Sequence, residues 1–152
     1  MFNLFSRGKR IVGIDIEEGY IRFVEIFKSS DEDKITAYGE VLPQRTIFEN
    51  SDIKDRNHFV FCLRAIKKQI RTSECFVSLP ERHVEYFRVL MPGGKDGVKR
   101  EDITKFLQSK NNISFDKEVF SFSFIKEEKG KTLFDVCVIN KALLRRYVEI
   151  LK

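Results

Sequence analysis

Two apolar, β-branched runs near the start of the chain set its pattern of hydrophobic and polar positions. They cover residues 11–16 and 20–27 and are separated only by Glu17, Glu18 and Gly19. This spacing predicts a β-hairpin with a glycine-containing loop. Both strands should therefore lie side by side in one sheet.

Alternation along the first of these strands leaves a carboxylate near its end. Side chains point to opposite faces in turn, so Ile11, Gly13 and Asp15 should share one face. The other face should then hold three apolar side chains, those of Val12, Ile14 and Ile16. A carboxylate on a mostly buried strand is unusual. Asp15 is therefore a candidate site residue.

The pattern then continues the first sheet and adds a helix. Residues 34–42 alternate until Pro43, which predicts a third antiparallel strand with Ile35, Ala37, Gly39 and Val41 on one face. Over residues 51–71 apolar side chains recur at helical spacing, which predicts an amphipathic helix. The apolar run 74–79 can return as a fourth strand, parallel to an earlier one.

Beyond Pro80 a second α/β unit is predicted. A strand over 84–91 is followed by a helix over 100–110 and a hairpin of strands over 119–125 and 133–138. Asn140 is suited to cap a final helix. That helix carries an apolar stripe at helical spacing, made of Leu144, Tyr147, Val148 and Leu151.

Composition indicates a soluble globular protein. The 152 residues are 42% hydrophobic and 34% charged, and no apolar run approaches the length of a membrane-spanning helix. The 28 basic residues are mixed along the chain with 23 acidic ones. The net charge of +5 therefore does not indicate a nucleic-acid partner. Aromatic and basic residues interleave at Tyr86 to Arg88, but a buried strand explains this equally well. We expect a cytoplasmic location.

The amino terminus allows two interpretations. Arg7, Lys9 and Arg10 follow Phe2, Leu4 and Phe5, an arrangement that suits a short anchor on a membrane surface. The alternative is a frayed leader.

No residue pattern indicates a metal site or an enzyme. Cys62, Cys75 and Cys137 are odd in number and lie in apolar runs, which is typical of reduced core thiols. His58 and His83 lack zinc-ligand spacing and are interpreted as surface histidines. The glycine-rich residues 93–97 match no nucleotide motif and are interpreted as a turn.

The sequence resembles the amino-terminal half of PilM-type pilus assembly proteins, of the actin-like ATPase superfamily that includes FtsA. The matching parts are the opening MFNLFSRGKRIVGIDI, the LPxxxVxxxRxxxP pattern of residues 79–92, the helix over 101–110 and the closing FDVCVINKALLRRYVEILK. The resemblance implies an actin-like, ribonuclease H-like fold, truncated relative to the family. Residues 1–80 and 140–152 would form a partial subdomain 1A, and residues 81–139 an inserted small α/β subdomain 1C.

The resemblance also implies a phosphate loop, in a degenerate form. Asp15 and Gly19 fall on the family's nucleotide loop, but Glu17 and Glu18 replace its first glycine and serine. A carboxylate within ~4 Å of a phosphate costs about 1 kcal/mol in water and more when partly buried. We therefore expect no ATP with magnesium, no other cofactor and no catalysis. The alternative is one lobe of an actin-like nucleotide-binding ATPase.

A partner-binding role is what the resemblance implies instead. The chain would be an adaptor in a type IV pilus (fimbrium biogenesis) or related secretion platform, at the inner face of the cytoplasmic membrane, and would bind the short cytoplasmic tail of a PilN-like membrane protein. The expected contact residues are Ser78, Leu79, Pro80, Arg82, Val84, Ile103, Phe106 and Leu107. The apolar stripe of the last helix would then pack on the subdomain 1A sheet. The face where the missing part of 1A belongs would stay open, which further predicts self-association, or a companion chain, through subdomain 1A.

Overall fold

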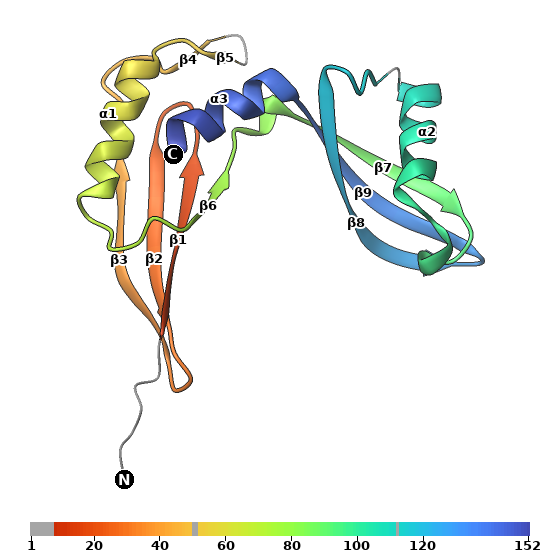
Figure 1. Ribbon diagram of the computed structural model, residues 1–152, viewed down its shortest axis with the longest axis horizontal. Coiled ribbons are helices and arrows are strands. Elements are labelled where there is room, and N and C mark those ends of the chain that lie inside the picture. Colours follow the sequence, from red (N-terminus) through yellow and green to blue (C-terminus); the bar gives the residue numbers. More distant parts are fainter. Residues whose placement is uncertain (1–7, 50–51, 112) are drawn as a thin grey trace. The chain divides into compact units, whose positions relative to one another are not determined.

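The computed structural model describes residues 8–49, 52–111 and 113–152. It has the mixed α/β class that the sequence predicted (Figure 1). The chain forms two compact units, with the main boundary between Pro80 and Glu81. Each unit has its own sheet and is described by itself.

The first unit is built on a four-stranded sheet. Its strand order is β3 (Asp33–Val41), β2 (Ile21–Lys28), β1 (Lys9–Ile16) and β6 (Cys75–Ser78). The β1 and β2 strands pair as the predicted antiparallel hairpin, and β6 runs parallel to β1 as expected. The predicted alternation in β1 is confirmed, since its three buried side chains are those of Val12, Ile14 and Ile16.

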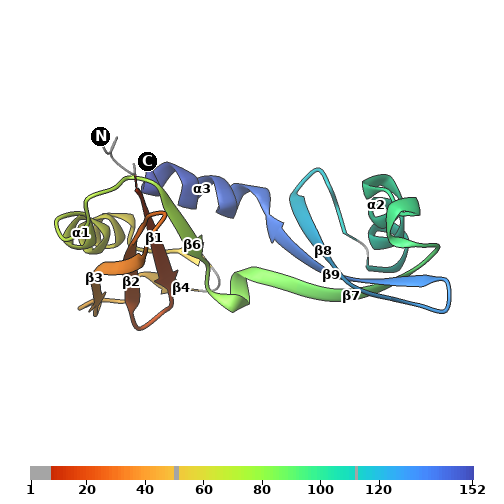
Figure 2. The ribbon, with the colours of Figure 1, turned by 90° about the horizontal axis from the view of Figure 1, so that it is seen from below.

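One face of this sheet carries the core of the unit. Helix α1 (Arg56–Lys67) supplies the buried side chains of Phe59, Cys62 and Ile66, and it lies on one side of the sheet (Figure 2). The Asp55 carboxylate accepts a hydrogen bond from the His58 N–H at 2.9 Å, so the helix begins later than the predicted residue 51. The chain before it forms a short hairpin that the sequence did not predict, β4 (Phe48–Glu49) with β5 (Asp52–Ile53).

A β-bulge changes the phase of β3. Glu25 pairs with Ala37 and Ile26 pairs with Ile35, so Thr36 is an extra residue between two pairs. Because one inserted residue reverses the alternation, Ile35 lies on the exposed side and keeps 61% of its surface accessible. The prediction that Ile35 shares a face with Ala37 was therefore wrong.

The second unit is a three-stranded antiparallel sheet covered on one face by a helix. The strand order is β7 (Val84–Pro92), β9 (Lys131–Asn140) and β8 (Glu118–Glu128), and the helix is α2 (Arg100–Asn111). Short 3₁₀ turns, η1 (Glu81–His83) and η2 (Lys95–Gly97), precede β7 and α2. The core holds side chains of all four long elements, among them Val89, Ile103, Leu107, Phe120 and Val136.

The last helix, α3 (Lys141–Leu151), begins where the sequence predicted. The Asn140 side chain accepts hydrogen bonds from the N–H groups of Ala142 and Leu143, as an N-cap does. Tyr147 is buried, whereas Val148 is 44% exposed. The assignment of this helix to subdomain 1A, and the docking of its apolar stripe on the first sheet, stay predictions.

Candidate functional site

Asp15 and Ser78 are neighbours in the first sheet, although the sequence assigned them to separate sites. They are paired residues of the parallel strands β1 and β6, and Asp15 also lies opposite Arg22 in β2. On the face away from the apolar residues of β1, these side chains border a shallow cavity of about 490 Å³. Its apolar lining includes Val24 and the exposed Phe76. The cavity is therefore open and mostly apolar, with Asp15 and Arg22 as its charged lining residues.

The loop after β1 does not offer its first amide to a ligand. The Glu17 N–H donates a hydrogen bond to the Tyr20 carbonyl at 3.0 Å, which closes the hairpin. Gly19 is exposed, and a Cβ atom there would meet nothing within 4 Å. Gly19 is not one of the described glycines that have a positive φ. Neither the surrounding space nor the backbone conformation therefore requires glycine at this position.

The cation opposite Asp15 in β2, Arg22, is already engaged. The Arg22 Nε lies 2.6 Å from the Glu40 carboxylate, and its guanidinium stacks on the Tyr20 ring at 3.9 Å from the ring centre. The hydrogen bond to Glu40 raises the pKa of Arg22 above its ordinary value, and the Asp15 charge adds to this. Arg22 is therefore not positioned to neutralise a phosphate.

We expect the purified chain to bind no ATP in the presence of magnesium. The carboxylates of Glu17 and Glu18 would face the phosphates, and the first loop amide is occupied. Titration calorimetry with ATP and magnesium should give no binding heat, and a double variant Glu17→Gly, Glu18→Ser is the control for charge repulsion. A micromolar or tighter site in the unaltered chain would contradict the prediction.

The predicted partner segment contains both exposed and buried residues. Ser78 and Arg82 are exposed, Leu79 and Val84 are half-buried, and Pro80 is buried. Exposed positions on this segment can contact a partner directly, whereas the Pro80 side chain cannot. The proposed contact of Pro80 with a partner is therefore corrected.

His83 is buried, so its interpretation as a surface histidine was wrong. Its ring is 6% exposed, and Nδ1 lies 2.9 Å from the Tyr147 hydroxyl of α3. The two rings also pack at 5.8 Å between centres. A hydrogen bond to a buried aromatic residue makes His83 a structural link between η1 and α3.

The helix residues expected to touch a partner are mostly core residues. Ile103 and Leu107 are completely buried beneath the sheet of the second unit, and Phe106 is half-buried against the same core. A side chain with no accessible surface cannot line a binding cleft. The predicted partner contacts of Ile103 and Leu107 are therefore corrected; Phe106 keeps part of its surface accessible.

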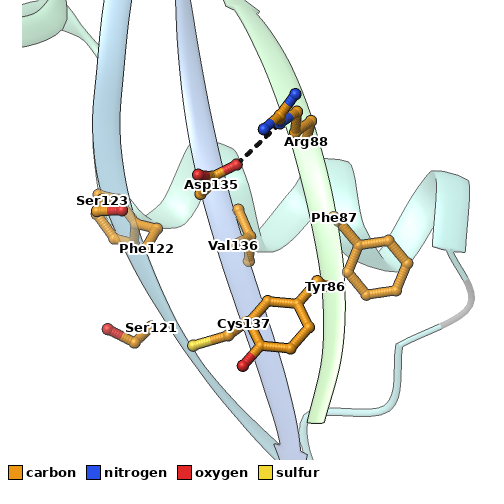
Figure 3. A pocket seen from close by; sticks show the side chains of 9 residues that line it. All are labelled: Tyr86, Phe87, Arg88, Ser121, Phe122, Ser123, Asp135, Val136 and Cys137. Carbon is orange, nitrogen blue, oxygen red and sulfur yellow. Dashed lines mark hydrogen bonds and ion pairs between the residues drawn. The ribbon is translucent and has the colours of Figure 1, made fainter. Parts of the chain in front are cut away.

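The structure adds a surface that sequence reasoning missed. On the three-stranded sheet, a cavity of about 590 Å³ is lined by nine residues, shown in Figure 3: Tyr86, Phe87, Arg88, Ser121, Phe122, Ser123, Asp135, Val136 and Cys137. Tyr86 is 67% exposed, and Arg88 pairs with Asp135 at 3.2 Å. The positive charge of Arg88 is balanced by the negative charge of Asp135. The surface therefore suits a polypeptide better than a strongly charged ligand.

The signal for this surface was the alternation within β7. Val89 and Met91 are buried, whereas Tyr86, Arg88 and Leu90 lie on the other side of the strand and are exposed. The sequence was interpreted as a buried strand at Tyr86 to Arg88. Only one of its faces is buried, because α2 covers only that side.

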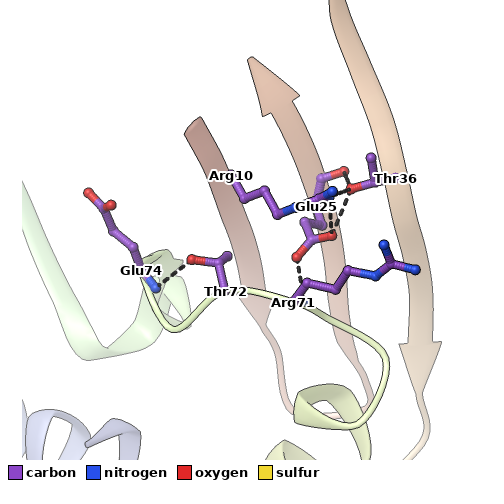
Figure 4. A network of polar contacts seen from close by, with 6 residues as sticks. All are labelled: Arg10, Glu25, Thr36, Arg71, Thr72 and Glu74. Carbon is purple, nitrogen blue, oxygen red and sulfur yellow. Dashed lines mark hydrogen bonds and ion pairs between the residues drawn. The ribbon is translucent and has the colours of Figure 1, made fainter. Parts of the chain in front are cut away.

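Glu25 is another residue that sequence reasoning did not single out. Its side chain is 1% exposed. Its carboxylate accepts hydrogen bonds from Thr36 Oγ1 at 2.7 Å and from the Arg71 backbone N–H at 2.6 Å (Figure 4). Arg10 adds an ion pair at 3.3 Å. Burial acts to raise the pKa of Glu25, but these hydrogen bonds and the Arg10 charge outweigh it and lower the pKa. The network joins three strands to the loop after α1, which is a structural role.

The basic residues next to the amino terminus are also engaged within the fold. Lys9 pairs with Glu74 at 2.7 Å, and Arg10 with Glu25. The apolar part of the proposed membrane anchor, Phe2 to Phe5, and Arg7 lie outside the described residues. Within the described part of the chain, no helix has the length and hydropathy needed to cross a membrane.

The described residues contain no group of three metal-ligating side chains. All three cysteines are free thiols, and burial raises the pKa of Cys62.

Sequence comparisons give no relative for this chain. No protein-family model matches it. No curated protein sequence matches it either.

Solved structures do match, and they decide the fold. One is a chain of a PilM–PilN type IV pilus biogenesis complex, with a TM-score of 0.73 and 12% identity over 93% of this protein. The chain has a PilM-like, actin-like fold. Another is the cytoplasmic domain of EpsL, an inner-membrane component of the type II secretion system of Vibrio cholerae, with a TM-score of 0.56 and 12% identity over 94% of this protein.

This protein spans 43% of the length of the first of these chains and 52% of the second. At 12% identity the likeness concerns the fold. The resemblance inferred from the opening hairpin and the residues 79–92 is confirmed at this level.

Proposed function

We propose that the chain is a non-enzymatic adaptor at the inner face of the cytoplasmic membrane, in a type IV pilus or related secretion platform. The observation that carries the proposal is the shared fold with a chain solved in a PilM–PilN complex. A cytoplasmic domain of an inner-membrane secretion component has the same fold, which supports the same setting. The partner would be the short cytoplasmic tail of a membrane protein.

The open face of β7 is the best-suited part of the described surface for such a tail. Tyr86 offers a large ring that is 67% exposed, and the Arg88–Asp135 pair offers polar groups beside it. Exposed aromatic and arginine side chains contribute most to binding at protein interfaces. Arg82, exposed in η1, is a residue of the predicted partner segment in the same unit.

We expect substitution of Tyr86 to weaken tail binding. The test uses fluorescein-labelled peptides with the cytoplasmic tails of membrane proteins encoded beside this gene, and fluorescence anisotropy as the readout. Tyr86→Ala should weaken binding about tenfold, since an exposed aromatic anchor is lost. Tyr38→Ala is the matched control, because Tyr38 is a strand tyrosine of the first unit that is 79% exposed.

Two results would contradict the proposal. One is that none of the tail peptides binds the unaltered chain. The other is that Tyr38→Ala weakens binding as much as Tyr86→Ala does, which would move the site away from β7.

A further inference from the structure

Helix α1 and the loop that follows it carry basic side chains without any acidic ones. Residues 56–71 contain no Asp or Glu, and their basic residues, all exposed, are Arg56, Arg64, Lys67, Lys68 and Arg71. The other two helices differ, because each includes acidic residues, such as Glu101 in α2 and Glu149 in α3. The outer side of α1 is therefore a local source of positive potential on a chain of otherwise mixed charge.

These positive charges are not neutralised within the fold. Among the described residues, no carboxylate forms an ion pair with Arg64, Lys67 or Lys68. The Lys67 ammonium donates a hydrogen bond to the Thr72 carbonyl at 3.2 Å, which leaves its charge uncompensated. The three cations lie near the carboxyl end of α1, where they also favour the helix dipole.

An exposed phenylalanine lies among these cations, and the helix dipole does not explain it. Phe61, in the middle of α1, is 67% exposed, and its stacking on the half-buried His58 ring at 6.1 Å covers only part of it. Phe61, Arg64 and Lys68 are three and seven residues apart, so they share one face of the helix. Side chains such as Ile66 occupy the opposite face, toward the sheet (Figure 1).

Cations around an exposed aromatic ring match the chemistry of an anionic lipid surface. Lys and Arg are attracted to anionic headgroups, while an aromatic ring enters the apolar boundary beneath them. Nucleic acid also attracts cations, but bases stack on successive aromatic side chains. Phe59, the other phenylalanine of α1 within two residues of Phe61, is buried, so the face offers no such series. The observations therefore favour lipid.

We infer that the outer face of α1 binds directly to a surface of anionic phospholipid, with Arg64, Lys67 and Lys68 at the headgroups and Phe61 inserted between them. The apolar side of α1 is occupied by the core of the first unit, so the contact is shallow. Few cations and one ring give a weak, salt-sensitive association. The inference goes beyond the proposed function, which requires only the tail of a membrane protein, and does not depend on it.

Flotation of the purified chain with lipid vesicles tests the inference. Vesicles of phosphatidylcholine mixed with phosphatidylglycerol should bind the chain at low salt and release it at high salt, whereas pure phosphatidylcholine should not bind it. The double variant Arg64→Gln, Lys68→Gln should bind about tenfold more weakly, because two headgroup contacts are lost. Phe61→Ala should bind about fivefold more weakly, because the inserted ring is lost.

The double variant Lys105→Gln, Lys110→Gln is the matched control, since both lysines are exposed on α2 and the net charge falls by the same amount. It should bind the mixed vesicles as the unaltered chain does. Because all the replaced side chains are exposed, the variants should keep the circular dichroism spectrum of the unaltered chain.

Three results would overturn the inference. The first is that the unaltered chain binds neither kind of vesicle, or binds both equally. The second is that the α2 control weakens binding as much as the α1 double variant does, since net charge alone would then explain it. The third is that the α1 double variant loses binding to duplex DNA but not to the vesicles, which would assign the face to nucleic acid. The assay contains no peptide, so its outcome is independent of tail binding at Tyr86.

Discussion

Replacement of Leu107 by alanine should destabilise the second unit by about 2–5 kcal/mol, because it leaves a cavity in a packed core. Leu107 is completely buried, together with Ile103 of the same helix and Val89, Phe134 and Val136 of the sheet. Removing three heavy atoms from such a site loses both apolar burial and close packing. Amide hydrogen exchange measures the effect, since protection of β9 should fall while that of β1 should not change.

Gln108→Ala provides the matched control for this prediction. Gln108 is the next residue of α2 and is exposed, so its replacement should change the free energy of unfolding by less than about 0.5 kcal/mol. If Leu107→Ala were as stable as Gln108→Ala but bound the tail peptides more weakly, the original assignment of Leu107 to partner contact would be correct and its assignment to the core wrong.

Replacement of Glu25 by alanine should destabilise the first unit by about 3 kcal/mol, because hydrogen-bond donors would be left buried without their acceptor. Thr36, Arg10 and the Arg71 N–H all point to this carboxylate. Chemical denaturation followed by circular dichroism measures the loss. Glu40→Ala is the matched control, since the Glu40–Arg22 pair is largely exposed and should contribute little to stability.

The contribution of Glu25 should also depend on pH. Its pKa in the folded protein is lowered from the ordinary value of 4.5. A lowered pKa stabilises the fold above the unfolded value, and this contribution is lost as the pH falls through the folded value. The stability advantage of the unaltered chain over Glu25→Gln should therefore shrink as the pH falls below the ordinary pKa of 4.5. A difference that stays constant as the pH falls would contradict the charged state assigned to Glu25.

The order and type of the long elements could be predicted because they depend on short-range patterns. The β1–β2 hairpin follows from two alternating runs and a three-residue loop, and the start of α3 follows from Asn140. The same patterns in residues 79–92 carried the resemblance to PilM-type proteins, which the shared fold confirms. Asp15 and Ser78 could be singled out, but not their pairing, because parallel strands join residues that are far apart in sequence.

The sequence by itself determined which faces of the strands and helices are apolar, because side-chain alternation and helical spacing are local properties of the chain. Only the tertiary structure decided which faces are covered. Ile103 and Leu107 are hidden because α2 lies on the sheet, whereas Tyr86 is exposed because no described element covers its side of β7. The phase change at Thr36 and the burial of Glu25 also depend on pairing between strands, since a bulge and a buried carboxylate are stabilised by partners distant in sequence.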